Sequence, residues 1–304
     1  MTTALVHLAS GVGNIVFATP LLVALDELGV TVDVCLDADY PQTADLLRPW
    51  SVVRAVCTGR RPDARWFVDY DAVVPAIPPF YWRRFASSYR SVPRTAARPP
   101  DRLFAADEQA YYLEFAHALG YPRGRRPTCQ LPVGPRDDED RVDLGTVVIA
   151  PGCKTGQMAA KRWPHFAALA ARFANVAIVG TAEDLQRSDG SQLRFPPHAR
   201  SFVGALTLRE TAELMAAAGV VVANDSGLAH VAAAVGTPTL MLFGPTGEAC
   251  LGPLPANAAI ARAGLPCEPC WTSAPLGACA GRVDCLEQLS VDTIERRIRT
   301  LVGA

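Results

Sequence analysis

Two loops of this sequence carry residue types that bind a phosphate group. The first is the turn Asn224-Asp225-Ser226-Gly227, which stands between an apolar run and a helix of small residues that contains His230. A helix that begins after such a turn offers free N–H groups and a dipole that attract an anion. From spacing alone an alternative remains open, in which Asp225 only caps the helix and His230 only fills the core.

The second loop, residues 151–163, contains both lysines of the chain, Lys154 and Lys161, whereas the other basic residues are arginines. A compact ammonium group on a flexible stem suits a diphosphate. A solvated surface lysine is the alternative interpretation of Lys161. The residues by themselves therefore predict one anion-binding turn at 224–227 and leave the role of the lysine-containing loop open.

The second half of the chain predicts a layered α/β frame for these loops. Short β-branched runs predict strands at 144–150, 176–179, 199–203, 220–223 and 239–243. Helices are predicted between them at 164–173, 207–218 and 228–235. Thr207 and Glu210 form a capping box, and Gly236 with Pro238 ends the last helix. In such a parallel sheet the loops at the carboxyl ends of the strands form the ligand site.

The first half of the chain also opens like a doubly wound domain. A strand, a glycine turn, a helix and a strand are predicted at 4–9, 10–14, 15–28 and 30–36. Pro20 either kinks this helix or marks its true start. The turn is not a dinucleotide fingerprint, because Gly11 and Gly13 are followed by Val16 where a third Gly or Ala belongs. An NAD-dependent oxidoreductase is therefore disfavoured.

The composition restricts the class of protein further. The chain has 304 residues, half of them hydrophobic, which is enough for two domains with sizeable cores. A net charge of −1 argues against a nucleic-acid partner held by a general basic field. We find neither a signal-peptide pattern in residues 1–30 nor an apolar run that would span a membrane, so we expect a cytoplasmic protein. Its nine cysteines are then expected as thiols or metal ligands.

These motifs together resemble glycosyltransferase family 9, the heptosyltransferase-like enzymes. The family signature Asp-Ser/Thr-Gly-x-x-His matches Asp225 to His230, and its further positions match the following residues: Ala232–Ala234, Gly236, Pro238 and Phe243–Thr246. The family's Lys-x-Trp-Pro matches 161–164. The glycine turn is similar to the family's Gly-x-Gly-Asp opening, with Asn14 where many members carry an Asp thought to be the catalytic base.

The resemblance implies an α/β fold of the GT-B type, with two Rossmann-like doubly wound domains facing across a cleft. Residues 1–140 would bind the acceptor and residues 141–304 a nucleotide-diphospho sugar. The implied reaction is inverting transfer of a sugar, heptose-like and from ADP-heptose as the best guess, to a glycan or glycolipid acceptor, with no cofactor needed for catalysis. A peripheral position at the inner face of the membrane is compatible with such an acceptor. A non-catalytic nucleotide-sugar-binding paralogue remains the alternative, because Asn14 cannot act as an Asp would.

The resemblance also assigns roles to single residues. Lys161 would contact the donor diphosphate and Glu183 the ribose, and the rest of the donor site would be Asp225, Ser226, Gly227 and His230. Asn14 and Asp225 are the catalytic candidates, and the acceptor loop would consist of Gly11, Gly13 and Asn14. Asp37 and Asp39, which follow a predicted strand, are other candidates for the base, whereas His7 lies inside a strand and is expected in the core.

The C-terminal part contains a cysteine-rich segment, 267–285, with the pattern Cys267-x₂-Cys270-x₈-Cys279-x₅-Cys285. Cys-x-x-Cys suits a tetrahedral metal, although the spacing of the second pair is not a standard zinc pattern. By resemblance, some related autotransporter heptosyltransferases hold iron in such a segment. A structural Zn or Fe site and a loop of reduced thiols both remain open. A final amphipathic helix is predicted at 290–301, and the resemblance implies that it crosses back to the N-terminal domain.

Overall fold

A computed structural model describes residues 2–59, 66–85, 107–135, 142–154, 161–186, 191–270 and 283–303. The chain divides into two compact units, Met1–Pro132 with Ala249–Leu254, and Val133–Glu248 with Pro255–Ala304. The sequence predicts a boundary after residue 140 and assigns all of 249–254 to the second domain. Residues 249–254 join the first unit because the buried Gln109 side chain donates to the Leu251 carbonyl at 2.5 Å.

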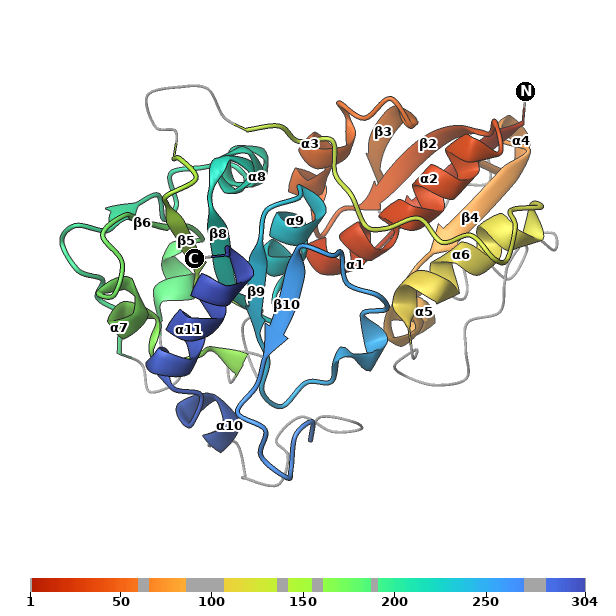
Figure 1. The fold of residues 1–304 in the computed structure, drawn as a ribbon. Coiled ribbons are helices and arrows are strands. Elements are labelled where there is room, and N and C mark those ends of the chain that lie inside the picture. Colours follow the sequence, from red (N-terminus) through yellow and green to blue (C-terminus); the bar gives the residue numbers. More distant parts are fainter. Residues whose placement is uncertain are drawn as a thin grey trace. The chain divides into compact units, whose positions relative to one another are not determined.

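The first unit is built on a parallel four-stranded sheet in the order β3-β2-β1-β4 (Figure 1). Its elements are β1 (Thr3–Leu8), α1 (Val12–Phe17), α2 (Thr19–Glu27), β2 (Thr31–Asp37), η1 (Pro41–Thr43), α3 (Ala44–Leu47), β3 (Val53–Gly59), α4 (Trp66–Asp69), β4 (Ala72–Ala76), η2 (Pro79–Tyr81), α5 (Trp82–Phe85) and α6 (Glu108–Ala118). The order reverses direction at β1, so the glycine turn after β1 leaves the sheet where ligands bind in doubly wound folds.

The single helix predicted over 15–28 is two helices, α1 and α2, which join at Ala18. Pro20 lies in the first turn of α2, where a missing N–H costs no hydrogen bond. Pro20 therefore marks a helix start. The break separates the short helix α1, which begins within the glycine turn, from α2, which packs along the sheet.

The second unit has a six-stranded parallel sheet in the order β10-β9-β8-β5-β6-β7 (Figure 1). Its elements are β5 (Val147–Ala150), α7 (Phe166–Ala170), β6 (Val176–Ile178), η4 (Ala182–Leu185), β7 (Arg200–Ser201), α8 (Leu208–Ala217), β8 (Val220–Asn224), α9 (Gly227–Ala234), β9 (Thr239–Leu242), β10 (Ala258–Ala261), α10 (Asp284–Glu287) and α11 (Val291–Leu301). The short helix η5 (Glu248–Cys250) begins at the last residue of this stretch of the second unit and continues into the 249–254 segment of the first. The predicted capping box of Thr207 and Glu210 is present at α8. Strands β5 and β8 are neighbours at the point where the order reverses, which is the usual ligand edge of this fold.

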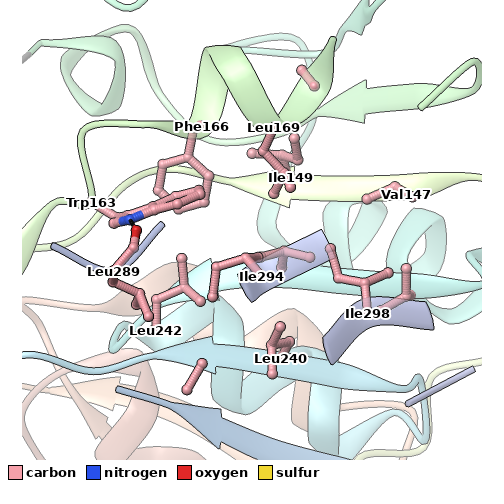
Figure 2. Packing of buried hydrophobic residues seen from close by; sticks show 14 of the residues in the cluster. Val147, Ile149, Trp163, Phe166, Leu169, Leu240, Leu242, Leu289, Ile294 and Ile298 are labelled. Atoms are coloured by element: carbon pink, nitrogen blue, oxygen red, sulfur yellow. Dashed lines mark hydrogen bonds between the residues drawn. The ribbon is translucent and has the colours of Figure 1, made fainter. Parts of the chain in front are cut away.

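One core of the second unit lies between its sheet and the helices α7 and α11 (Figure 2). Ile294 and Ile298 of α11 are fully buried in this cluster, which also contains Trp163, and the Trp163 indole N–H donates to the Leu289 carbonyl at 2.8 Å. The expectation that the last helix crosses to the N-terminal domain is therefore wrong for this chain. The apolar side chains of α11 pack against the sheet of its own unit. Among the residues described, no helix is long and apolar enough to cross a membrane.

Candidate functional site

The two predicted phosphate loops leave neighbouring strands at the same sheet edge. Strands β5 and β8 pair in parallel as far as Ala150 and Ala223, so the chain leaves both strands side by side. Lys161 returns to this edge, and its Nζ lies 2.7 Å from Oδ2 of Asp225. The sheet therefore brings together two charged residues that are 64 positions apart in sequence.

Asp225 is the centre of the cluster. Its Oδ2 also accepts a hydrogen bond from Oγ1 of Thr246 at 2.8 Å, and its Oδ1 lies 3.8 Å from Nε2 of His230. Burial opposes ionisation of Asp225, but the charge of Lys161 and the His230 side chain outweigh it and hold the pKa of Asp225 well below its usual range. The carboxylate thus stays charged and holds Lys161, whose side chain is 9% exposed.

The N-terminus of α9 completes the cluster. Ser226 is the N-cap in an extended conformation, and its side chain makes no capping hydrogen bond. The buried Ser226 Oγ has no hydrogen-bond partner within the described part of the chain. The alternative in which Asp225 merely caps the helix is excluded, because the cap is Ser226 and Asp225 faces Lys161. The unpartnered hydroxyl, the N–H groups of the first turn of α9 before His230 and the ammonium group can together bind an anion.

Asn224, which the sequence indicated only as a turn residue, fixes the two loops to each other. Its side chain is completely buried; Nδ2 donates to the Pro151 carbonyl at 2.6 Å, and Oδ1 accepts from the Trp163 backbone N–H at 2.9 Å. Because Trp163 is also anchored by Leu289, the backbone near Lys161 is held from two sides. In the sequence, the role of Asn224 is indicated only by its position next to Asp225.

Glu183 lies on the neighbouring loop after β6, in η4, and it is exposed. Arg162 ties this loop to the lysine loop, since its Nη1 donates to the carbonyls of Glu183 at 2.9 Å and Gln186 at 2.6 Å. The loop after β5 approaches η4 so closely that a Cβ at Gly152 would lie 2.2 Å from the Asp184 carboxylate, which explains the glycine at this position. Glu183 therefore stands at the same sheet edge, and its predicted contact with a ribose stays a prediction.

Asn14 belongs to the first unit, where the structure reveals a partner that sequence reasoning missed. The Nδ2 of Asn14 donates to both carboxylate oxygens of Glu108, at 2.8 and 3.0 Å, and its Oδ1 accepts from Oγ of Ser10 at 3.1 Å. Burial raises the pKa of Glu108 to about 7, although hydrogen bonds from Tyr112 and Asn14 act in the opposite direction. A glutamate is seldom buried, so the sequence does not indicate that Glu108 turns inward, and only the fold shows it.

The other acidic candidates of the first unit are engaged elsewhere. Asp39 accepts from Arg84 at 2.5 Å, and Asp37 lies 3.8 Å from the same guanidinium. His7 is completely buried and packs edge-on against Phe85, as expected of a core residue. Burial lowers the pKa of His7 to about 4, so this ring is neutral near neutral pH.

The predicted metal site is only partly within the described residues. Cys267 is exposed and Cys285 is buried, whereas Cys279 lies outside the residues that the structure describes. Across the described ranges, no group of three or more His, Cys, Asp or Glu side chains is placed to hold a metal ion. Structural metal in this segment stays a prediction.

The sequence profile of glycosyltransferase family 9 (heptosyltransferase) matches residues 108–276, which is more than half of the 304 residues. This chain belongs to glycosyltransferase family 9. The match includes Lys161, Asp225 and His230, so the cluster around Asp225 lies inside the family's region.

Individual family 9 proteins agree with this assignment. The chain is 38% identical to lipooligosaccharide heptosyltransferase 2 of Haemophilus influenzae over 122 residues, 37% of this chain and 35% of that protein. It is 36% identical to lipopolysaccharide heptosyltransferase 2 of Salmonella typhimurium over 122 residues, 37% of this chain and 34% of that protein. The matched stretch thus spans about a third of the length of these curated relatives.

The fold of this family 9 chain is similar to a solved structure, ADP-heptose LPS heptosyltransferase II of E. coli. The TM-score is 0.71 at 22% identity, and the similarity covers 100% of this chain and 99% of that chain. The predicted GT-B fold with two Rossmann-like domains is confirmed by this likeness together with the two parallel sheets.

Proposed function

We propose that this family 9 chain transfers a heptose from ADP-heptose to a lipid-linked oligosaccharide of the lipopolysaccharide type. The observation that carries the proposal is the cluster of Lys161, Asp225 and Thr246 at the N-terminus of α9. Its relatives are named heptosyltransferases, which supports heptose as the sugar and lipopolysaccharide as the acceptor. A cytoplasmic location with peripheral contact to the membrane belongs to the same proposal.

The donor diphosphate would bind at the start of α9. Lys161 would exchange its ion pair with Asp225 for the phosphate oxygens, which carry more charge and offer more acceptors. The unpartnered hydroxyl of Ser226 and the first N–H groups of α9 would donate to the same phosphate. Asp225 would remain ionised and would keep its contacts with His230 and Thr246.

The reaction breaks the bond between the anomeric carbon and the diphosphate and forms a bond from that carbon to an acceptor hydroxyl oxygen. Inversion follows from family membership, with attack from the face opposite the leaving ADP. The hydroxyl proton is lost to a basic group, and the negative charge that develops on ADP is stabilised by Lys161 and the α9 N–H groups. These groups supply the leaving-group stabilisation without a cofactor.

Calorimetry with ADP tests the donor site. Lys161→Ala should weaken ADP binding by about 1.5–3 kcal/mol, the scale of a charge-assisted contact. Lys154→Ala is the matched control, because it removes the same charge from the same loop and should leave affinity unchanged. Equal ADP affinity of folded wild-type and Lys161→Ala protein would refute this placement of the diphosphate.

A further inference from the structure

Asn14 stands where a catalytic base is expected for the proposed transfer but cannot act as one, and a carboxylate is hydrogen-bonded directly to its side chain. An amide does not take up a proton near neutral pH, so Asn14 acts only by donating or accepting hydrogen bonds. Glu108 is 6% exposed, and both of its carboxylate oxygens accept from the Asn14 amide nitrogen. A buried carboxylate in this position has a structural cost, which suggests that it serves the turn that it contacts.

The amide of Asn14 is held in one of its two possible orientations. Glu108 accepts at the nitrogen end, and Ser10 donates from Oγ to the oxygen end. Ser10 has φ 87°, a left-handed conformation that is uncommon for residues other than glycine. A Cβ on Gly11 would lie 3.6 Å from Oδ1 of Asn14, so the glycine leaves one side of this oxygen open. The second lone pair of Oδ1 remains for another donor.

We propose that Glu108 is the positioning residue of the acceptor site, because its ionised carboxylate holds the Asn14 amide so that Oδ1 receives the hydrogen bond of the acceptor hydroxyl. This inference rests on the proposed transferase function and adds to it the group that controls Asn14. When Glu108 is protonated, its O–H donates to Oδ1 instead, and the amide turns over. Asn14 then presents N–H groups to the acceptor, which is the wrong polarity for a hydroxyl about to lose its proton.

The surroundings of Glu108 favour a switch near neutral pH. On its own helix Tyr112 donates to Oε1 at 2.5 Å, and the nearby Tyr111 is an uncharged phenol. Cys129 faces Glu108 as a neutral thiol, because burial raises its pKa to about 12. The neighbouring charges are already paired: Arg126 binds Asp107 at 2.5 Å, and Glu27 of α2 accepts from Tyr121 and pairs with Arg125.

No cation therefore compensates the Glu108 carboxylate through any contact among the residues described. Burial is the dominant influence, and it raises the pKa of Glu108 to about 7. We therefore expect the relative populations of the two Asn14 amide orientations to reverse within the physiological pH range.

The orientation of Asn14 is measurable without any substrate. The sequence has only four asparagines, so selective ¹⁵N-asparagine labelling gives a simple spectrum of side-chain amides, and Asn14→Ala assigns the signal. We expect the Asn14 NH₂ resonances to shift with a midpoint near pH 7 and to lose that titration in Glu108→Gln. Tyr112→Phe is the control; it removes one donor to Glu108 and should raise the midpoint without abolishing the titration.

The consequence for transfer is tested with ADP-heptose and heptose-free lipopolysaccharide. Glu108→Gln should lower kcat on the order of 10–100-fold above neutral pH, the cost of a misplaced reacting group, and should remove the rise of kcat through pH 7. ADP affinity, which depends on the second unit, should not change. The exchange variant Asn14→Asp with Glu108→Gln moves the carboxylate to position 14, keeps an amide–carboxylate pair and should recover activity relative to Glu108→Gln.

The outcomes separate this inference from the proposed function. A folded wild-type protein that transfers no heptose contradicts the proposed function, and the amide spectrum then still decides the Glu108 contact. Transfer by Glu108→Gln with the rate and pH profile of wild type would overturn the inference while leaving the function intact. Asn14 amide signals that do not titrate in wild type would also overturn it.

Discussion

Replacing Asn224 with alanine tests whether one buried side chain holds the loop that carries Lys161 to the loop that carries Asp225. The change removes the acceptor of the Trp163 N–H and the donor to the Pro151 carbonyl, both at a completely buried position. A buried polar group left without a partner costs about 1–3 kcal/mol. The free energy of unfolding should therefore fall by about 2–5 kcal/mol, measured by urea denaturation.

The same substitution should also weaken the donor site. Lys161 is two positions from Trp163 in sequence, so release of the Trp163 backbone loosens the lysine, and we expect ADP affinity to fall about tenfold, about 1.4 kcal/mol. Asn257→Ala is the matched control in the same unit, since its Nδ2 also donates to two backbone carbonyls, those of Ala233 and Thr237.

The control separates loop positioning from general destabilisation. Asn257→Ala should lower stability by about 1–3 kcal/mol and leave ADP affinity unchanged. The reasoning fails if Asn224→Ala is no less stable than Asn257→Ala, or if both variants bind ADP as wild type does.

Two further predictions concern stability and metal content. Glu108 has a folded-state pKa of about 7 against an ordinary 4.5, so the folded protein binds more protons than the unfolded chain between these values. Wild type should lose about 3 kcal/mol relative to Glu108→Gln as pH rises from about 4.5 to about 7, and urea titrations that run parallel at all pH values would contradict this. If the cysteine-rich segment 267–285 holds a metal, elemental analysis of protein purified without chelator should find about one Zn or Fe per chain, and chelation should lower its Tm. Protein that contains no metal and whose Tm is unchanged by the chelator would favour reduced thiols.

The strands and the turn that carries Asp225 were predictable because their signals are local. Apolar β-branched runs lie between glycine, proline and capping residues, and the loop carrying Asp225 follows directly from that pattern. The clustering of Lys161 with Asp225 was predictable only by resemblance, since their contact depends on the pairing of β5 with β8. The predicted helix over 164–173 is shorter, Phe166–Ala170, because the chain from Trp163 is first fixed by side-chain contacts.

The partners missed by the sequence are all buried polar groups with distant contacts. Glu108 is 94 positions from Asn14, and Asn224 is 73 positions from Pro151. No periodicity or spacing indicates that a particular acid or amide turns inward. The sheet on which α11 packs is also not predictable from the sequence, because Ile294 and Ile298 mark the helix as amphipathic without showing which sheet they contact.

The most direct test of the central claim is a transfer assay with ADP-heptose and heptose-free lipopolysaccharide. Mass spectrometry of the acceptor and chromatography of released ADP are read from the same reaction. The account predicts one heptose added for each ADP released, with loss of both in Lys161→Ala and retention in Lys154→Ala. Binding of ADP-heptose without ADP release in the presence of this acceptor would contradict the account and favour a non-catalytic nucleotide-sugar-binding protein.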